Sequence, residues 1–279
     1  MTHLRLGLIG DNIGASRAPR FHMLAGKQNG ISVTYDRLVP QVMERDFDSL
    51  FDHVMAAGYR GINITYPYKE RAATRVRIDD PGVRALGAVN TVLFDGEAPR
   101  GFNTDHSGFI SAWSKVWGNV NPGTTLVIGA GGVGRAISFA IATLGAREIR
   151  LADTDLPRAN RLAKALTEAF PALDVRVGAN AAALAADAQG LVNATPVGMT
   201  GHPGTPLPPP AMRGALWAFD AVYTPINTQF LTDATSAGLN TLSGFELFIG
   251  QAVDAWNLFS ERPIDEARLR ADLAAEEIT

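Results

Sequence analysis

The stretch Val127-Ile-Gly-Ala-Gly-Gly-Val-Gly-Arg-Ala-Ile137 carries glycines in the spacing G-x-G-x-x-G. It directly follows a predicted strand over 125–128 and opens a predicted helix over 134–144. In this context Gly129 allows a tight turn, Gly131 lets a ligand approach the backbone, and Gly134 lets helix and strand pack closely. Free N–H groups at the helix start would bind a pyrophosphate, so the stretch predicts a dinucleotide site. The alternative is a glycine turn that only packs a helix on a sheet. The expected contacts are Gly129, Ala130, Gly131, Gly132, Val133 and Gly134.

Asp153 closes the next predicted strand, over 148–152, where a carboxylate would accept hydrogen bonds from ribose hydroxyls. Its negative charge would also repel a 2′-phosphate, and residues 152–156 contain no arginine to bind one. NAD is therefore the predicted cofactor, with NADP less favoured. An alternative stays open, because Arg150 and Arg158 lie close in the sequence and Asp153 would also suit the cap of the next helix.

Short aliphatic runs alternate with helical patterns along the chain, which is typical of βαβ units around a mostly parallel sheet. Residues 119–123 break this pattern just before the glycine stretch. We expect an α/β fold with two lobes and a cleft between them. Residues 1–106, with the C-terminal helices of 245–279 packing back on them, form an N-terminal α/β substrate and catalytic lobe. Residues 107–244 form a doubly wound Rossmann lobe that binds NAD.

The remaining elements are assigned from periodicity and from turn residues. Strands are expected over 4–9, 32–38, 61–65, 89–94, 100–103, 190–194 and 217–222. Helices are expected over 19–29, 46–57, 107–117, 157–169, 245–259 and 265–275. Residues 200–210 are too rich in proline and glycine for either structure and are interpreted as a surface loop, with a lid as one interpretation.

Composition excludes several classes of protein. The 279 residues carry a formal net charge of -3 and no cysteine, which argues against nucleic-acid binding, disulfides and thiolate catalysis. The histidines have no metal-ligand spacing, so no structural metal is expected. No apolar run is long enough to span a bilayer, and the chain is expected in the cytoplasm as a monomer or homodimer. The predicted partner is a small molecule.

Four further stretches are rich in polar residues at the ends of predicted strands, where open α/β sheets bind their ligands. They are Ser16-Arg-Ala-Pro19, Asn63-Ile-Thr-Tyr-Pro-Tyr-Lys69, Gly87-Ala-Val-Asn-Thr91 and Gly101-Phe-Asn-Thr-Asp105. Asp220-Ala-Val-Tyr-Thr-Pro225 and a stretch from Gly244 through Gln251 follow. In this order, around a dinucleotide motif, these stretches resemble the shikimate/quinate dehydrogenase family over nearly the whole chain.

The resemblance implies reversible hydride transfer between a nicotinamide and a hydroxyl-bearing ring carbon of a cyclic polyhydroxy acid. Shikimate and quinate are the expected substrates, and aromatic amino acid biosynthesis is the expected context. By the same resemblance, Lys69 and Asp105 are the catalytic pair. General chemistry agrees, because alcohol oxidation needs a group that takes the hydroxyl proton, and a lysine held by a carboxylate can relay it. The alternatives are a solvated Lys69 and an Asp105 that only caps a helix.

Substrate hydroxyls need donors and acceptors, and asparagine and glutamine supply both in one side chain. Asn63 has the alternative of being a turn former, and Tyr223 that of a packed core residue. The expected substrate contacts are Ser16, Asn63, Thr65, Asn90, Tyr223 and Gln251. Thr195 and Val222, near the ends of later predicted strands, are further expected cofactor contacts.

The chain departs from the family pattern at one position. Relatives usually have Ser-x-Ser or Ser-x-Thr before the proline, and these hydroxyls bind the substrate carboxylate, whereas Ala18 removes one here. Glu246 is also unexpected beside a substrate carboxylate. The two residues raise a second hypothesis, the same chemistry on an amino-substituted ring. A third, a non-enzymatic nucleotide-binding regulator, ranks last because both Lys69 and Asp105 are present.

Overall fold

The computed structural model describes residues 3–275, which form two compact units. One unit combines the residues up to Thr104 with those from Gln251 onward, and the other is the continuous segment Asp105–Gly250. Two helices cross from one unit to the other, α5 (Thr104–Trp117) near its first residue and α10 (Gly244–Ser260) near its middle. The predicted α/β fold class is confirmed.

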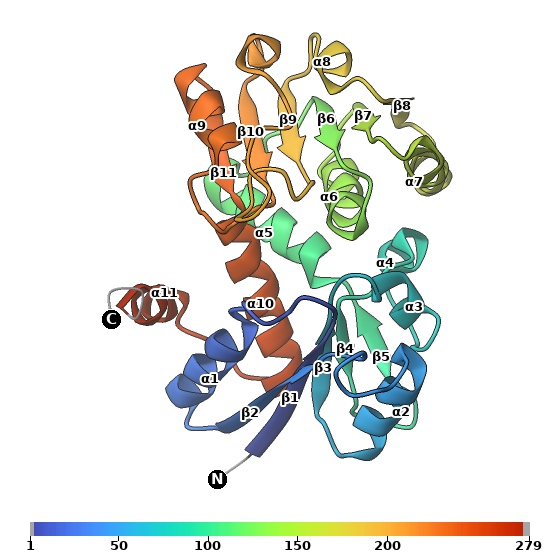
Figure 1. Ribbon diagram of the computed structural model, residues 1–279, viewed down its shortest axis with the longest axis vertical. Coiled ribbons are helices and arrows are strands. Elements are labelled where there is room, and N and C mark those ends of the chain that lie inside the picture. Colours follow the sequence, from blue (N-terminus) through green and yellow to red (C-terminus); the bar gives the residue numbers. More distant parts are fainter. Residues whose placement is uncertain (1–2, 276–279) are drawn as a thin grey trace. The chain divides into compact units, whose positions relative to one another are not determined.

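The first unit contains a five-stranded sheet in the order β2-β1-β3-β4-β5 (Figure 1). The first three strands are parallel, and β4 is antiparallel to both of its neighbours. The strands are β1 (His3–Ile9), β2 (Ser32–Leu38), β3 (Gly61–Ile64), β4 (Thr91–Leu93) and β5 (Arg100–Phe102). The carboxyl ends of β1, β2 and β3 therefore meet at one edge of the sheet, where ligands bind in such folds.

Helices cover both faces of this sheet. An apolar cluster that includes Leu50, Phe51 and Ile62 packs α2 on one face. On the other, the ring of Phe259 lies so close to the sheet that a Cβ at Gly61 would be 2.4 Å from it. The helices of this unit are α1 (Ala18–Asn29), α2 (Phe47–Ala56), α3 (Lys69–Ala73), α4 (Pro81–Leu86), the end of α10 and α11 (Glu266–Ala275).

The second unit contains a six-stranded, all-parallel sheet in the order β11-β10-β9-β6-β7-β8 (Figure 1). This is the doubly wound arrangement, in which the strand order reverses between β6 and β9. The strands are β6 (Thr124–Ile128), β7 (Glu148–Ala152), β8 (Asp174–Gly178), β9 (Gly190–Asn193), β10 (Trp217–Asp220) and β11 (Asn240–Ser243). The helices are α5, α6 (Gly132–Thr143), α7 (Leu156–Ala169), α8 (Ala181–Leu184), η1 (Pro209–Met212), α9 (Gln229–Ser236) and the start of α10.

The structure adds elements that periodicity did not predict: α3, α4, α8, α9, β8 and β11. The two strands lie at the edges of the second sheet, and only Leu242 of β11 is buried, so neither has a continuous apolar run. Strand β10 ends at Asp220, before the predicted 222, because the Asp220 carboxylate accepts the Val222 N–H and turns the chain. Within the proline-rich loop, Leu207 is fully buried, which anchors the loop to its unit.

Two kinds of feature are absent from residues 3–275. No helix in this range is long and apolar enough to cross a membrane. No group of three or more His, Asp or Glu side chains in the same range is placed to hold a metal ion.

Candidate active site

The glycine loop joins β6 to α6 at the point where the strand order reverses. Gly129 has a φ of +99°, and a Cβ there would lie 2.8 Å from the Ala194 carbonyl oxygen. A Cβ at Gly134 would lie 1.9 Å from the Gly129 carbonyl oxygen. Both positions therefore require glycine, the first for the turn and the second for the close approach of helix and strand.

Gly131 differs from these two glycines. It has an ordinary φ of -72°, it caps α6, and a Cβ there would meet nothing within 4 Å. The backbone N–H of Arg135 bonds the Gly131 carbonyl at 2.8 Å, so the N–H groups of residues 132–134 lie in the first turn, which has no intrahelical acceptors. A pyrophosphate fits this open, electropositive helix end, because Gly131 leaves it room and the N–H groups supply donors.

Asp153 lies directly against the glycine loop. Its Oδ2 accepts the Ala130 N–H at 2.7 Å, and its Oδ1 accepts the Asp155 N–H at 2.8 Å. Each carboxylate oxygen has a second lone pair, so the group can accept ribose hydroxyls as well. The cap of α7 is another residue, Asp155, which accepts the Arg158 N–H at 3.0 Å.

The arginines near Asp153 in the sequence have other partners. Arg158 pairs with the Asp155 carboxylate at 3.1 Å. Arg150 is buried, where it donates to the Leu184 carbonyl at 3.0 Å and pairs with Glu148 at 2.9 Å. Arg150 is thus engaged in the interior of its unit, whereas Arg158 is half-exposed and pairs with the residue that caps α7.

The loops after β9 and β10 are joined by a buried hydrogen-bond network. Asn193 accepts from the Thr195 N–H and hydroxyl at 3.0 and 2.7 Å, and its Nδ2 donates to Asp220 at 2.9 Å. Asp220 also accepts from the Val222 N–H at 2.9 Å and the Thr228 hydroxyl at 2.6 Å. Thr195 and Val222 are expected cofactor contacts. The buried Asp220 carboxylate holds the backbone of Val222 directly and that of Thr195 through Asn193.

Asp220 is fully buried. Burial raises the pKa of its carboxyl to about 6, although the hydrogen bonds from Thr228, Val222 and Asn193 act to lower it. The neighbouring Tyr223 stacks on Phe248 with ring centroids 5.3 Å apart. Neither Asn193 nor Asp220 was among the residues expected at the site, although each is a polar residue that closes an apolar strand, which is a signal the sequence contains.

In the first unit, several predicted contacts gather at the carboxyl ends of β1 and β3. The Thr65 N–H donates to the Ile9 carbonyl at 2.9 Å, and Thr65 packs against Gly10. The Val89 N–H donates to the Lys69 carbonyl at 2.9 Å, which ties the start of α3 to the segment that holds Asn90. Lys69 is only 8% exposed, which excludes the alternative that it is a solvated surface lysine.

Ser16 lies in the loop before α1. Its hydroxyl oxygen accepts the Ala18 N–H at 3.3 Å, and its carbonyl accepts from Arg37 at 3.0 Å. The loop is thus held from both sides, and Ala18 contributes its backbone but no hydroxyl.

Asn63 has internal partners on both sides of its amide. Its Oδ1 accepts the Tyr35 hydroxyl at 2.8 Å, and its Nδ2 donates to the Thr91 hydroxyl at 3.0 Å. Asn90 differs, because its Oδ1 accepts the Thr104 N–H at 2.7 Å and the Thr91 hydroxyl at 3.1 Å, while its Nδ2 donates to none of residues 3–275. Thr91 and Thr104 belong to the polar stretches 87–91 and 101–105, but neither was predicted as a contact. Tyr35 was not expected near the site, because its partner Asn63 is remote in the sequence.

The remaining expected residues lie on the two helices that cross between the units. Asp105 lies in the first turn of α5 and is 8% exposed. Gln251 and Glu246 lie on α10. The pairing of Lys69 with Asp105 and the contact of Gln251 with substrate stay predictions.

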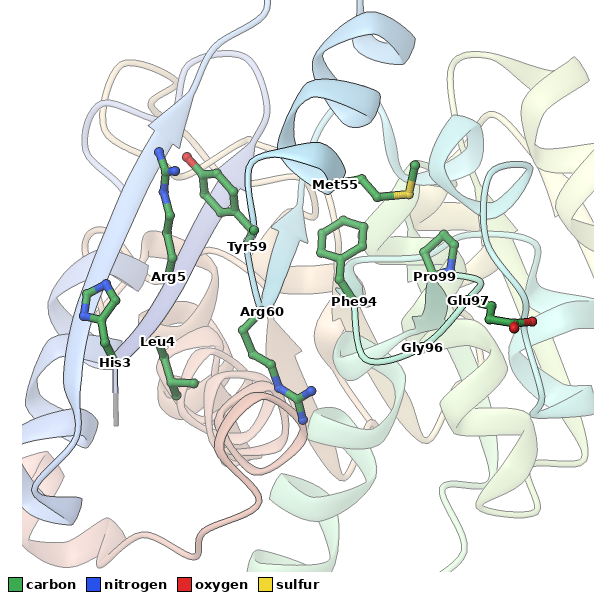
Figure 2. Close-up of a pocket in the computed structure, with 11 residues that line it drawn as sticks. His3, Leu4, Arg5, Met55, Tyr59, Arg60, Phe94, Gly96, Glu97 and Pro99 are labelled. Carbon is green, nitrogen blue, oxygen red and sulfur yellow. The ribbon is translucent and has the colours of Figure 1, made fainter. Parts of the chain in front are cut away.

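A hollow of about 520 Å³ lies elsewhere in the first unit, at the amino ends of β1 and β3 (Figure 2). Arg5 lies over the Tyr59 ring and pairs with Asp36 at 3.4 Å, while Arg60 pairs with Glu261 at 2.8 Å. The expected ligand contacts follow the carboxyl ends of the same strands. We therefore assign this hollow no part of the candidate site.

A doubly wound sheet with a glycine loop at its switch point, in a chain whose other α/β unit contains a buried lysine, is typical of the class of nucleotide-dependent dehydrogenases. The family described as shikimate dehydrogenase substrate binding domain matches residues 8–92. A quinate/shikimate dehydrogenase (NAD(+)) of Corynebacterium efficiens is 40% identical over 278 residues, covering 95% of this chain and 96% of that protein. The chain therefore belongs to the shikimate/quinate dehydrogenase family, and the family predicted from its motifs is confirmed.

Two solved structures are similar over almost the whole chain. Quinate dehydrogenase from Corynebacterium glutamicum, in complex with NAD, has a TM-score of 0.91 and 34% identity, covering 99% of this chain and 100% of that one. Shikimate 5-dehydrogenase from Thermus thermophilus, in complex with NADP(H) and shikimate, has a TM-score of 0.82 and 30% identity, covering 96% and 97%. Relatives with either cofactor thus share this fold.

Proposed function

We propose that this protein catalyses the reversible, NAD-dependent oxidation of a ring hydroxyl of quinate, shikimate or both. The observation that carries the choice of cofactor is the Asp153 carboxylate, held 2.7 Å from the Ala130 N–H of the glycine loop. A carboxylate there accepts ribose hydroxyls and repels a 2′-phosphate. The relatives named as NAD(+) enzymes and the NAD-bound quinate dehydrogenase support the same choice.

The bound NAD would accept a hydride from the ring carbon that carries the hydroxyl. The residues of the chain bind and orient the reactants and move the proton. We assign Lys69 as the group that takes the hydroxyl proton and Asp105 as the carboxylate that holds the resulting ammonium. Ser16, Thr65, Asn90, Tyr223 and Gln251 are the assigned substrate contacts. The lack of cysteine fits a reducing compartment, so a cytoplasmic enzyme, monomeric or homodimeric, is part of this proposal.

The test is turnover of quinate and shikimate by the purified protein with NAD and with NADP. We expect reduction of NAD with at least one acid, and a loss of about 10²- to 10⁴-fold in kcat in Lys69→Ala. NAD binding by Lys69→Ala, measured by calorimetry, should stay unchanged, since Lys69 lies outside the nucleotide-binding unit. A wild-type protein that reduces neither cofactor with either acid contradicts the proposal.

Ala18 favours a second candidate function, which is the same hydride transfer on an amino-substituted analogue of shikimate. The missing hydroxyl weakens the binding of a substrate carboxylate, and Glu246 would suit a ring that carries an ammonium. Adding amino-substituted analogues to the substrate panel separates the candidates. A higher kcat/KM for an analogue than for both parent acids would select this second candidate.

A further inference from the structure

A ladder of polar side chains, half-buried at Tyr35 and buried at Asn63 and Thr91, runs across the first sheet near its ligand-binding edge. Tyr35 of β2 reaches past β1 to Asn63 of β3, and Asn63 contacts Thr91 of β4. We propose that this ladder of Tyr35, Asn63 and Thr91 positions Asn90, so that the Asn90 amide presents its N–H₂ group to a substrate hydroxyl. The proposal rests on the proposed function for its substrate and changes the role of Asn63 from a substrate contact to a positioning residue.

The directions of the first two hydrogen bonds in the ladder follow from its first member, Tyr35. A tyrosine hydroxyl donates one proton, and here it donates to Asn63 Oδ1 at 2.8 Å. The Asn63 amide must then turn its Nδ2 toward Thr91, whose hydroxyl oxygen accepts at 3.0 Å. Since the Thr91 oxygen accepts on that side, its own proton can go to Asn90 Oδ1, 3.1 Å away, or to the Thr104 hydroxyl, also 3.1 Å away. In the second case the Thr104 hydroxyl donates to Asn90 Oδ1 at 3.2 Å, so Asn90 Oδ1 is an acceptor in both.

The burial of Asn63 and Thr91 makes a lost partner in the ladder costly. Thr91 is 0% and Asn63 7% exposed, so water does not replace a lost partner without cost. Burial also raises the pKa of the Tyr35 hydroxyl well above its ordinary value, which keeps it protonated and a donor. His22 stacks on Tyr35 with ring centroids 5.1 Å apart, which fixes the phenol ring.

The ladder ends at Asn90, which also contacts the start of α5, the helix that carries Asp105. Its Oδ1 accepts both from Thr91 and from the Thr104 N–H, at 2.7 Å, at the start of α5. With its oxygen held on this side, the Nδ2 of Asn90 faces away from the ladder. An amide that flipped would place its N–H₂ group against the Thr104 N–H, where two donors would meet.

Tyr35→Phe tests the ladder at the point farthest from Asn90. Without the phenol proton, Asn63 is no longer oriented, and we expect KM for the acid to rise about three- to tenfold, the effect of one lost hydrogen bond. The dissociation constant of NAD should stay within twofold, because the ladder lies outside the second unit. Tyr59→Phe is the matched control, since it removes a phenol that donates to Asp36 at 2.5 Å, away from the ladder, and it should leave KM unchanged.

Thr91→Val and Thr91→Ser separate orientation from packing. Valine keeps the shape of the side chain but removes the hydroxyl, so KM for the acid in Thr91→Val should rise at least as much as in Tyr35→Phe. Serine keeps the hydroxyl, so KM in Thr91→Ser should stay close to the wild-type value. If the ladder acts as a unit, KM for the acid in the double variant Tyr35→Phe/Thr91→Val should equal that in Thr91→Val alone. Additive effects, or a KM within twofold of wild type in both single variants, would overturn the proposal.

The orientation itself can be measured without turnover. Side-chain amide protons of Asn63 should exchange slowly with solvent in wild-type protein and at least tenfold faster in Tyr35→Phe, with no change in Tyr59→Phe. Unchanged exchange in Tyr35→Phe refutes the ladder even if the enzyme acts on another acid. An inactive wild-type protein with the expected exchange pattern refutes the substrate assignment instead.

Discussion

The Asp153 carboxylate accepts the Ala130 N–H at 2.7 Å, so the predicted ribose-binding group and the glycine loop form one rigid arrangement. Two backbone N–H groups hold the carboxylate, the second from Asp155, which leaves little freedom for it to turn aside for a 2′-phosphate. We therefore expect cofactor choice to depend on the loop and the strand end together.

Asp153→Ser should narrow the preference for NAD over NADP. The variant loses a charged acceptor for the ribose hydroxyls, a loss of about 1.5 to 3 kcal/mol or roughly ten- to a hundredfold in NAD affinity, and it also loses the repulsion of a phosphate. The ratio of kcat/KM for the two cofactors measures the effect. A ratio equal to that of wild type would rule out the ribose assignment.

Gly131→Ala should impair NAD binding without harming the fold. A Cβ at this position meets no protein atom within 4 Å but occupies the space in front of the helix end. We expect the free energy of unfolding to change by less than about 1 kcal/mol, while the dissociation constant of NAD rises at least tenfold. Gly134→Ala is the contrasting variant, because its Cβ would lie 1.9 Å from a carbonyl oxygen, and it should lose about 1 to 3 kcal/mol of stability. Equal NAD affinity in wild type and Gly131→Ala would contradict the pyrophosphate assignment.

Ala18→Ser should lower KM for the carboxylate substrate. It restores a second hydroxyl next to Ser16, and one hydrogen bond to a charged group corresponds to roughly tenfold in affinity or more. KM for NAD should stay constant, which serves as the internal control. If KM for both quinate and shikimate is unaffected, the carboxylate does not bind at the start of α1.

Asp220→Asn should change how stability depends on pH. The raised pKa, about 6 against 3.8, means that the folded protein binds this proton more tightly than the unfolded chain does. The contribution of Asp220 to stability is therefore largest below about pH 4, falls as the pH rises toward 6, and stays low above that. Between pH 4 and pH 7, the free energy of unfolding of wild type should fall by up to about 3 kcal/mol relative to that of the variant. Denaturant unfolding of both proteins at each pH measures the difference, and a constant difference would show that the carboxyl titrates normally.

Local patterns predicted the parts of this protein that depend on neighbouring residues. The turn at Gly129 and the N-terminus of α6 follow from residues within one βα unit, and the strand over 32–38 matches β2 because its ends are marked by turn residues. The edge strand β8, with alternating half-exposed residues and no buried aliphatic run, depends on pairing with β7 and was missed.

Side-chain partners across the sheet could not be predicted in the same way. Tyr35 and Asn63 are 28 positions apart, and the sequence of β2 does not show that its tyrosine reaches over β1 to β3. Asn63 lies near the carboxyl end of β3, and its role at a ligand site stays a prediction, whereas its internal partners depend on strand order. The cap of α7 is a smaller example, since Asp153 and Asp155 are both suitable caps and only the backbone geometry selects Asp155.

The crossing of the chain between its two units has a consequence for biosynthesis. One unit needs residues from both ends of the polypeptide, whereas Asp105–Gly250 is continuous. As the nascent chain leaves the ribosome, the unit Asp105–Gly250 has all of its residues while the other unit still lacks the end of α10 and α11. The first unit is thus completed after the second, and a translation product that stopped after Gly250 would retain the second unit without a finished partner.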